Sequence, residues 1–403
     1  MRYIEFLNVS FKDNWDRPVH RWYRFHAGCS AVFPESVMDF LRVGKEATVL
    51  DPFVGSGTTL VCAKLRGINS VGFDVNPLYV FMSRVKTYWE FDLADLYTCM
   101  KTLMKDLSEL QEFGNVDVTN IPEYIWRYFE WEILCKLSFI KEKVSKIKGK
   151  RKREFFLFAL ASILIDVSRV HYVGETIVFD KHSKSNVDVY KRYRNKLKEM
   201  LTDLKYVQNV EGKGKAKVKR CDARNLDSEV EDSSVNFIIT HPPYANNYNY
   251  LLHDRLPLYF LGYLKKPSDE KQLRNKMIGC VTKDKASIDL EPSLPEIKEL
   301  ASKILSTGDM ERCGTILEYF HSMDNVLRIF HKKLRKQGYC AMLVGNSYVR
   351  GVMIPLDILI AKMAKKIGFE ITTVSKVRDR GNGAFQHIYN GRLYESIVIF
   401  KKS

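Results

Sequence analysis

Paired cysteines and long apolar runs are absent from this sequence, and we expect no N-terminal leader. Its eight cysteines are scattered without a C-x-x-C pair, which argues against a zinc ribbon or a disulfide framework, so we expect no metal site. The longest apolar run, residues 155–165, is far shorter than the ~18 residues that a membrane span needs. These absences predict a cytoplasmic protein in a reducing compartment.

Acidic residues are scarce relative to basic ones. Lys and Arg number 64 against 48 Asp and Glu, so the formal net charge is +16. Hydrophobic residues make up 45% of the 403 positions, enough for a sizeable core. A folded chain with this excess of positive charge is expected to meet a polyanion, and because membrane insertion is excluded, nucleic acid is the leading candidate.

The order of predicted elements indicates an α/β fold. Residues 47–50 predict a buried strand, 58–66 a helix and 69–73 a second strand, which together form the βαβ unit that opens a doubly wound parallel sheet. Residues 36–42 predict a short helix before this unit. Strand signals return later, at 235–240, 339–344, 370–374 and 396–400.

Between these strand signals, residues 88–205 have helical periodicity, with helices expected at 122–137 and 155–170. We therefore predict a doubly wound, Rossmann-like sheet with a mainly helical insertion. The first part of the sheet domain spans residues 1–87, the helical insertion 88–205 and the rest of the sheet domain 206–403. We expect a second, irregular insertion within the last part, at about 263–310.

A glycine-rich turn, Asp51–Thr59, follows the first strand. Glycines there let the backbone pass close under a ligand, although an ordinary tight turn is an alternative. The turn does not match the phosphate-binding loop, because no Lys follows Gly57. It does not match the dinucleotide-binding fingerprint either, because Leu60 stands at the third glycine position. Asp74, at the end of the next strand, can accept hydrogen bonds from ribose hydroxyls or cap the next helix. Asp51 can hold the turn or meet a cationic group, so a nucleoside that carries a cation fits better than NAD.

A second turn, His241-Pro242-Pro243-Tyr244, follows the strand at 235–240. Two prolines fix the backbone and remove two N–H donors, and the turn should face the same crevice as the glycine turn. Tyr244 offers a flat face on which a base can stack. A rigid exposed loop is the alternative.

With these two turns, the chain resembles the S-adenosylmethionine-dependent amino-methyltransferases of nucleic acids, above all the cytosine-N4 and adenine-N6 DNA modification methylases. Residues 20–28 are similar to the methionine-binding segment of that family, 243–262 to its region after the catalytic loop, and 345–347 and 378–395 to its late strands. In one permuted class of the family, the target-recognition region occupies the place of the helical block here.

The resemblance implies a role for each matching residue. The catalytic turn would hold a base that has left its stack. The residues implied for S-adenosylmethionine are Asp51, Phe53, Gly55, Ser56, Gly57 and Thr58 around the cofactor, Asp74 at its ribose, Asp222 at its adenine, and His26, Ala27 and Gly28 at its methionine end. The residues implied for the target base are His241, Pro242, Pro243 and Tyr244.

The family pattern has Ser or Asp where this chain has His241. A neutral imidazole accepts a hydrogen bond from an amino group and a protonated one does not, so we expect activity to fall below pH ~6.5. Because Asp is more typical of adenine-N6 enzymes, His241 favours N4 of cytosine. No covalent intermediate is needed, since polar acceptors that make the amino nitrogen tetrahedral free its lone pair for attack.

Two basic segments are candidate phosphate contacts, although a solvated helix end and loop would account for either alone. Their residues are Lys146, Lys148, Lys150, Arg151, Lys152 and Arg153 in the first, and Lys213, Lys215, Lys217, Lys219 and Arg220 in the second.

DNA is favoured as substrate, with a restriction nuclease as the partner in that case. Four alternatives stay open: mono- or dimethylation of cytidine N4 in ribosomal or other structured RNA, methylation of adenine N6 in DNA, a non-catalytic nucleic-acid-binding protein on a degenerate methyltransferase fold, and a nicotinamide oxidoreductase. Only five glutamines occur, as in thermophilic proteins, where an RNA modification is a serious rival.

Overall fold

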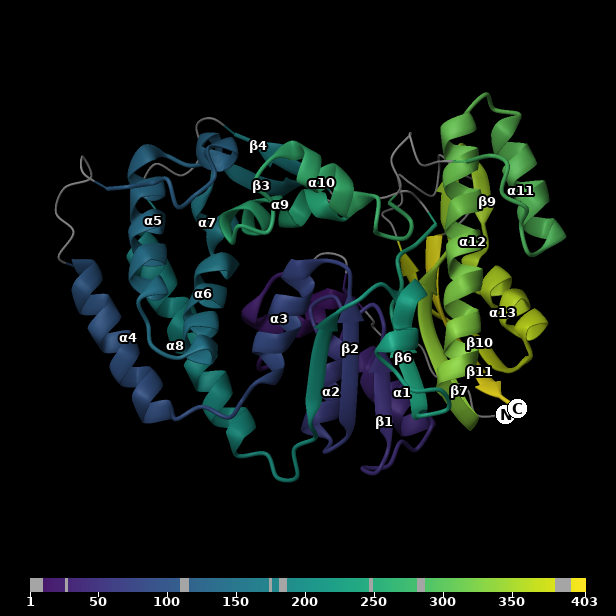
Figure 1. Cartoon of the computed structure of the whole chain (residues 1–403), viewed down its shortest axis with the longest axis horizontal. Coiled ribbons are helices and arrows are strands. Elements are labelled where there is room, and N and C mark those ends of the chain that lie inside the picture. Colours follow the sequence, from purple (N-terminus) through teal and green to yellow (C-terminus); the bar gives the residue numbers. More distant parts are fainter. Residues whose placement is uncertain are drawn as a thin grey trace.

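A mixed seven-stranded sheet forms the centre of the computed structural model (Figure 1). The structure describes residues 10–25, 28–108, 116–173, 176–180, 187–245, 249–280, 287–380 and 393–403. The strand order is β10-β11-β7-β6-β1-β2-β5. Neighbours from β7 to β5 run parallel, whereas β11 runs antiparallel to both β7 and β10. The strands are β1 Thr48–Asp51, β2 Asn69–Asp74, β5 Ala216–Arg220, β6 Val235–Thr240, β7 Leu334–Gly345, β10 Phe369–Arg380 and β11 Leu393–Lys402.

Helices cover both faces of this sheet, and alternate strand residues point to opposite sides. In β1, Val49 packs in the cluster of α1 and α2, whereas Leu50 packs in that of α12 and α13. This alternation follows from the period of two along a strand, and strands buried on both faces are typical of doubly wound folds. The predicted fold class is confirmed. The helices that cover the sheet are α1 Val32–Phe40, α2 Thr58–Leu65, α3 Pro77–Thr87, α12 Met310–Lys333 and α13 Leu356–Ile367.

The chain between β2 and β5 forms a mainly helical block beside the sheet, to the left in Figure 1. It contains a short β-hairpin that we did not predict. Its elements after α3 are α4 Leu93–Ser108, α5 Trp131–Ser145, α6 Lys150–Ser162, α7 Leu164–Val167, β3 Val170–Val173, β4 Thr176–Phe179 and α8 Val189–Gln208.

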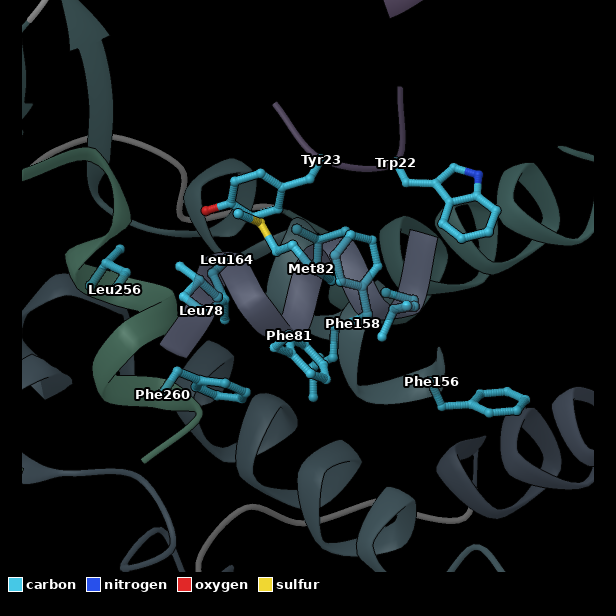
Figure 2. Close-up of a cluster of buried hydrophobic side chains, with 14 of the residues drawn as sticks. Trp22, Tyr23, Leu78, Phe81, Met82, Phe156, Phe158, Leu164, Leu256 and Phe260 are labelled. Carbon is cyan, nitrogen blue, oxygen red and sulfur yellow. The ribbon is translucent and has the colours of Figure 1, made fainter. Parts of the chain in front are cut away.

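The helical block shares one hydrophobic core with the sheet domain. Figure 2 shows Phe81 and Met82 of α3 beside Phe158 of α6, with Phe260 of α9 nearby. The N-terminal segment is tied to the same block, because Trp22 Nε1 donates to an Asp203 oxygen of α8 at 3.0 Å. The block therefore packs against the sheet domain through α3 and is joined to the N-terminal segment through α8.

A second group of elements separates β6 from β7 and follows β7. The expectation of an irregular insertion at 263–310 is wrong in part, since two helices, α10 and α11, lie there. α10 buries only Leu273 and so gives a weak apolar signal, whereas α11 has Ile297, Ala301 and Ile304 at helical spacing, a pattern that we did not use. The elements are α9 Leu251–Phe260, α10 Pro267–Arg274, α11 Pro295–Leu305, β8 Ser347–Val349 and β9 Val352–Ile354.

Most predicted strands and helices are confirmed to within a few residues, and β6 has the predicted bounds. The single helix expected at 122–137 is wrong, because a 3₁₀ helix, Glu123–Tyr128, gives way to α5 across extended backbone at Phe129 and Glu130. Short 3₁₀ helices also occupy Phe11–Trp15, His20–Trp22 and Ala223–Ser228. Within the described ranges, no helix is long and apolar enough to cross a membrane.

Candidate active site

The glycine turn lies between β1 and α2, at the carboxyl edge of the sheet. Gly55 and Gly57 have φ of +48° and +83°, the left-handed region that glycine adopts without steric cost. A Cβ on Gly57 would lie 3.0 Å from Oγ of Ser83, so this glycine lets α2 approach α3 closely. The Ser83 hydroxyl in turn donates to the Gly55 carbonyl at 2.8 Å. The turn is thus fixed from behind, while Gly55, Ser56 and Thr58 line a cavity on its other side.

Two carboxylates, the buried Asp51 and the half-buried Asp74, form one wall of this cavity. Asp74 accepts hydrogen bonds from the backbone N–H of Gly55 at 3.1 Å and of Asn76 at 2.9 Å, and burial raises its pKa to about 7. Asp51 accepts from Oγ1 of Thr240 at 2.6 Å, and burial raises its pKa to about 6. Neither carboxylate forms an ion pair with any described residue. Unneutralised carboxylates that face a cavity fit a ligand with hydroxyl groups and a positive charge.

The alternative role of Asp74 as a helix cap is not what the structure has. Asn76 is the N-cap of α3, and its side-chain oxygen accepts from the Leu78 N–H at 3.0 Å. Asp74 instead connects the glycine turn to this N-terminus. Each of its oxygens accepts one backbone bond and retains a lone pair for a ligand hydroxyl.

Asp222 follows β5 and lines the cavity on the side of β2. Its carboxylate is held by Arg224, whose Nε and Nη2 donate at 3.0 and 2.7 Å. The same Nη2 donates to the carbonyl of Lys276 at 3.0 Å. Asp222 is therefore oriented by an ion pair and connected to the segment after α10, which also lines the cavity.

The His-Pro-Pro-Tyr turn begins where β6 ends. The carbonyl of Pro243 accepts from the hydroxyl of Tyr319 at 2.8 Å, and the N–H of Tyr244 donates to the hydroxyl of Tyr250 at 2.9 Å. By contrast, no hydrogen bond among the described residues ends on the carbonyl of Pro242. Of the two proline carbonyls, that of Pro243 is thus the one that a described residue engages.

Tyr244 does not stand free in the cavity. Its ring lies under the guanidinium of Arg380, with Cζ 4.8 Å from the ring centroid, and its hydroxyl donates to Oε1 of Glu395 at 2.8 Å. Since Arg380 covers one face, a stacked base would have to use the opposite face. Stacking on Tyr244 stays a prediction.

His241 lines the cavity, and its Nε2 lies 2.9 Å from the hydroxyl of Tyr244. Burial lowers its pKa to about 4; Glu395 opposes this shift, and Arg380 and Arg378 add to it. The expected fall in activity near pH 6.5 is therefore wrong for this residue. An imidazole buried beside two guanidinium groups stays neutral to lower pH than a free one.

The cavity brings together most of the residues predicted for the cofactor and the target base. His26 and Ala27 lie outside the described residues, and Gly57 supports the turn without lining the cavity. The predicted residues that line it are Gly28, Asp51, Phe53, Gly55, Ser56, Thr58, Asp74, Asp222, His241, Pro242, Pro243 and Tyr244.

Among the cavity residues that were given no role by the sequence are three charged ones on β10 and β11: Arg378, Arg380 and Glu395. The pairing of β10 with β11 places Arg378 directly opposite Glu395, and Arg378 Nε donates to Glu395 Oε2 at 2.9 Å. The sequence did offer one signal for Glu395, because this acidic residue stands just before the apolar run Ile397–Phe400. In the structure Glu395 is only 5% exposed.

The first basic segment lies away from the cavity, whereas the second ends beside it, because Nε of Arg220 donates at 3.0 Å to the carbonyl of Val75, a cavity residue. The first basic segment leads into α6, where the guanidinium of Arg151 stacks on Tyr88. Tyr88 follows the C-terminal end of α3, which is the end away from the glycine turn. In the second, Lys213 lies in the loop from α8 to β5 at the lower edge of Figure 1, and its Nζ donates to the Gln208 carbonyl at 2.8 Å. The lysines of β5 lie on an outer strand of the sheet, where charged side chains hinder edge-to-edge pairing. Phosphate contact by these segments stays a prediction.

Comparison with known proteins agrees with this geometry. Residues 30–84 match the N6/N4 methyltransferase family model, described as "DNA methylase". The chain is 24% identical to type II methyltransferase M.BsoBI of Geobacillus stearothermophilus, over 98% of this chain and 87% of that protein. It is 23% identical to type II methyltransferase M.MvaI of Kocuria varians, over 91% and 84%.

A solved structure, geranyl diphosphate C-methyltransferase of Streptomyces coelicolor, covers 100% of this chain and 90% of its own, with 8% identity and a TM-score of 0.35. That likeness is too loose to carry an argument. The doubly wound sheet, with the glycine turn and the Pro-Pro-Tyr turn at its carboxyl edge, has the architecture of a Rossmann-like methyltransferase. With the family match at the glycine turn and the two relatives, the chain is similar to the N6/N4 DNA methylases.

Proposed function

We propose that this protein transfers a methyl group from S-adenosylmethionine to the exocyclic amino group of a base in DNA, at N4 of cytosine. The observation that carries the proposal is that the acidic wall of Asp51 and Asp74 and the turn His241–Tyr244 face one cavity. A donor held at the first and a base held at the second would meet there. Similarity to the family model described as "DNA methylase" supports the reaction and DNA as its substrate, and the two type II methyltransferase relatives support methyl transfer.

The cavity residues fit S-adenosylmethionine by their chemistry. Asp74 retains lone pairs for ribose hydroxyls, Asp222 has a carboxylate for the adenine amino group, and Asp51 offers negative charge toward the cationic end. When bound, the cofactor supplies a methyl carbon on a sulfonium, and the carbon–sulfur electron pair leaves with sulfur. Gly28 lines the cavity beside Phe25, whose ring lies against the glycine turn, so the N-terminal segment forms part of the same wall.

The base side of the cavity offers two hydrogen-bond acceptors. An aromatic amino group is a poor nucleophile because its lone pair is delocalised into the ring. Nδ1 of neutral His241 and the carbonyl of Pro242 would each accept one N–H, which favours a tetrahedral nitrogen with its lone pair free. As positive charge develops on that nitrogen, one of its protons would pass to Nδ1 of His241. His241, where adenine-N6 enzymes more typically have Asp, supports cytosine.

The carboxyl edge also carries basic residues outside the cavity. Lys265, Lys266 and Lys271 are exposed around α10, and exposed Lys276 lines the cavity. We infer that the DNA backbone lies over this edge, because phosphate contacts must position the strand whose base enters the cavity. The segment 146–153 and the start of the segment 213–220 would then contact only DNA that extends beyond the catalytic site, whereas Arg220 lies at the cavity edge.

Product analysis tests the proposal. The protein is incubated with S-adenosylmethionine and, in separate reactions, unmodified DNA and unmodified ribosomal RNA, and the digested nucleosides are separated by mass spectrometry. We expect N4-methyldeoxycytidine. N6-methyldeoxyadenosine would overturn the choice of base, and N4-methylcytidine or its dimethyl form the choice of DNA. If no product forms, calorimetric titration with S-adenosylmethionine separates a degenerate pocket, which gives no heat, from an enzyme whose substrate was missing.

If DNA is methylated, a restriction nuclease that reads the same sequence is the expected partner. Sequencing the methylated sites gives the sequence with which to test it.

A further inference from the structure

A chain of polar contacts runs from the cavity into the sheet behind it. Nε2 of His241 lies 2.9 Å from the hydroxyl of Tyr244, and this hydroxyl lies 2.8 Å from Oε1 of Glu395. The other carboxylate oxygen of Glu395 accepts from Nε of Arg378 at 2.9 Å and pairs with its Nη2 at 2.8 Å. Both Tyr244 and Glu395 are buried, with 8% and 5% of their surface exposed.

The negative charge of Glu395 determines in which direction the hydroxyl and imidazole protons of these contacts point. Glu395 faces Arg378 directly and has Nε of Arg380 3.8 Å from its Oε1, so it is held as a carboxylate, which only accepts hydrogen bonds. The hydroxyl of Tyr244 has one proton, and this proton must therefore point to Glu395. Toward His241 the tyrosine oxygen then presents lone pairs alone.

The contact between His241 and Tyr244 is a hydrogen bond only if Nε2 of the imidazole carries the proton. A neutral imidazole has one N–H, so Nδ1 is then the acceptor. Among the described residues, no hydrogen bond engages Nδ1 of His241, and the side chain lines the cavity. Nδ1 is thus left for a ligand.

We propose that Glu395 is a positioning residue: acting through the Tyr244 hydroxyl, it fixes His241 in the tautomer whose Nδ1 accepts the amino group of the target base. This rests on the proposed function, and it explains how a histidine can take the place of an acidic or hydroxyl residue in the catalytic turn. The sheet builds the device, because β11 brings Glu395 opposite Gly345 at the end of β7, beside Tyr244. Glycine is required there, since a Cβ at Gly345 would lie 2.7 Å from Cε2 of Tyr244.

The substitution Glu395→Gln tests the proposal with little change of shape. Arg378 would donate to the amide oxygen of the new glutamine side chain. The NH₂ group of that glutamine would therefore face Tyr244 and donate to the tyrosine oxygen. The tyrosine proton would then turn to Nε2 of His241, and Nδ1 would carry the imidazole proton. A donor would face the amino group of the base, so we expect kcat to fall by about 10²-fold, the lower end of what a misplaced proton acceptor costs. The Kd for S-adenosylmethionine should stay within about twofold.

The direct readout is the tautomer of His241, measured by ¹⁵N NMR on protein labelled at histidine and assigned by the loss of signals in His241→Gln. We expect the proton on Nε2 in the native protein and on Nδ1 in Glu395→Gln. Glu270→Gln is the matched control, because Glu270 is another carboxylate held by an arginine, Arg255 at 2.7 Å, outside the cavity. It should change neither the tautomer nor kcat.

Tyr244→Phe provides a second route if Glu395→Gln does not fold. It removes the hydroxyl and leaves both ends in place, so His241 should lose its single tautomer and populate both. An unchanged tautomer in the folded Glu395→Gln or Tyr244→Phe variant would overturn the proposal, as would unchanged kcat with a switched tautomer. If the native protein methylates nothing, the proposed function fails, while the tautomer measurement still decides whether Glu395 orients His241.

Discussion

The hydroxyl of Thr240 donates a hydrogen bond of 2.6 Å to Oδ1 of Asp51. Thr240 is the last residue of β6 and Asp51 the last of β1, and these two strands are parallel neighbours in the sheet. The bond joins the two turns of the candidate site at their bases. The side that would hold the methyl donor and the side that would hold the base are thus set relative to one another by a buried side-chain contact.

Replacing Thr240 with Val should weaken both stability and cofactor binding. The change keeps the side-chain shape but removes a donor to a buried carboxylate, which costs about 1–3 kcal/mol. The loss in the free energy of unfolding should be larger at pH 8, where Asp51 is ionised, than at pH 5. Denaturant unfolding at the two pH values measures it. Thr240→Ser keeps the donor and serves as control; equal stability of the two variants would refute the role of the bond.

The pKa of Asp74, raised by burial to about 7, predicts how cofactor binding depends on pH. Ribose hydroxyls donate to a carboxylate better than to a carboxylic acid, so affinity for S-adenosylmethionine should fall as the pH drops from 8 to 6. Calorimetric titration across this range measures the slope. Asp74→Asn should bind more weakly at pH 8 and show a flatter profile, whereas an unchanged profile in this variant would assign the dependence to another group.

The raised pKa values of Asp51 and Asp74 also predict how the stability of the ligand-free protein depends on pH. The pKa values of Asp51 and Asp74 lie above the ordinary value of 3.8, at about 6 and about 7, so the folded state binds more protons than the unfolded state between pH 4 and 7. The free energy of unfolding should therefore decrease as the pH rises through this window. A ligand that favours the ionised carboxylates should raise Tm more at pH 8 than at pH 5.5. Thermal melts with and without S-adenosylmethionine decide this; an equal rise at both pH values would contradict it.

How far the sequence could predict this molecule depends on how local each feature is. The strand Val235–Thr240 was predicted with its observed bounds because an apolar run is ended by two prolines. β5 was missed because its lysines give the pattern of a basic surface segment, although an edge strand tolerates them.

Contacts between distant residues were out of reach of sequence reasoning. Glu395 reaches Tyr244 only because β11 pairs antiparallel with β7, and no local pattern encodes that pairing. The pKa of His241 could not be predicted for the same reason, since it is set first by burial in the folded protein and then by charged groups on β10 and β11.

His241 gives a prediction for the pH–rate profile. Its pKa is lowered by burial to about 4, so at saturating S-adenosylmethionine kcat should stay level from pH 8 to about 5.5 and fall only below that. Saturation matters, because it removes the effect of pH on cofactor affinity. His241→Ser should abolish the fall at low pH if it retains activity. A midpoint near 6.5 in the native enzyme would show that the imidazole is less shielded than the structure indicates.

The position of the phosphate contacts can be decided by the salt dependence of DNA binding. Each phosphate contact contributes about 0.9 to the slope of log K against log[salt]. Replacing Lys265, Lys266 and Lys271 with Gln should lower the slope by about 2–3, because these lysines are exposed at the cavity edge of the sheet. An equal change of charge in the first basic segment, at Lys146, Lys148 and Lys150, should lower it by less than about 1.

Fluorescence anisotropy with a short duplex between 50 and 300 mM salt gives both slopes. The reverse result would place the DNA on the opposite edge. A base bound there could not reach His241, because α3 separates the start of α6 from the carboxyl ends of the strands, so that result would also count against the catalytic role of the His-Pro-Pro-Tyr turn.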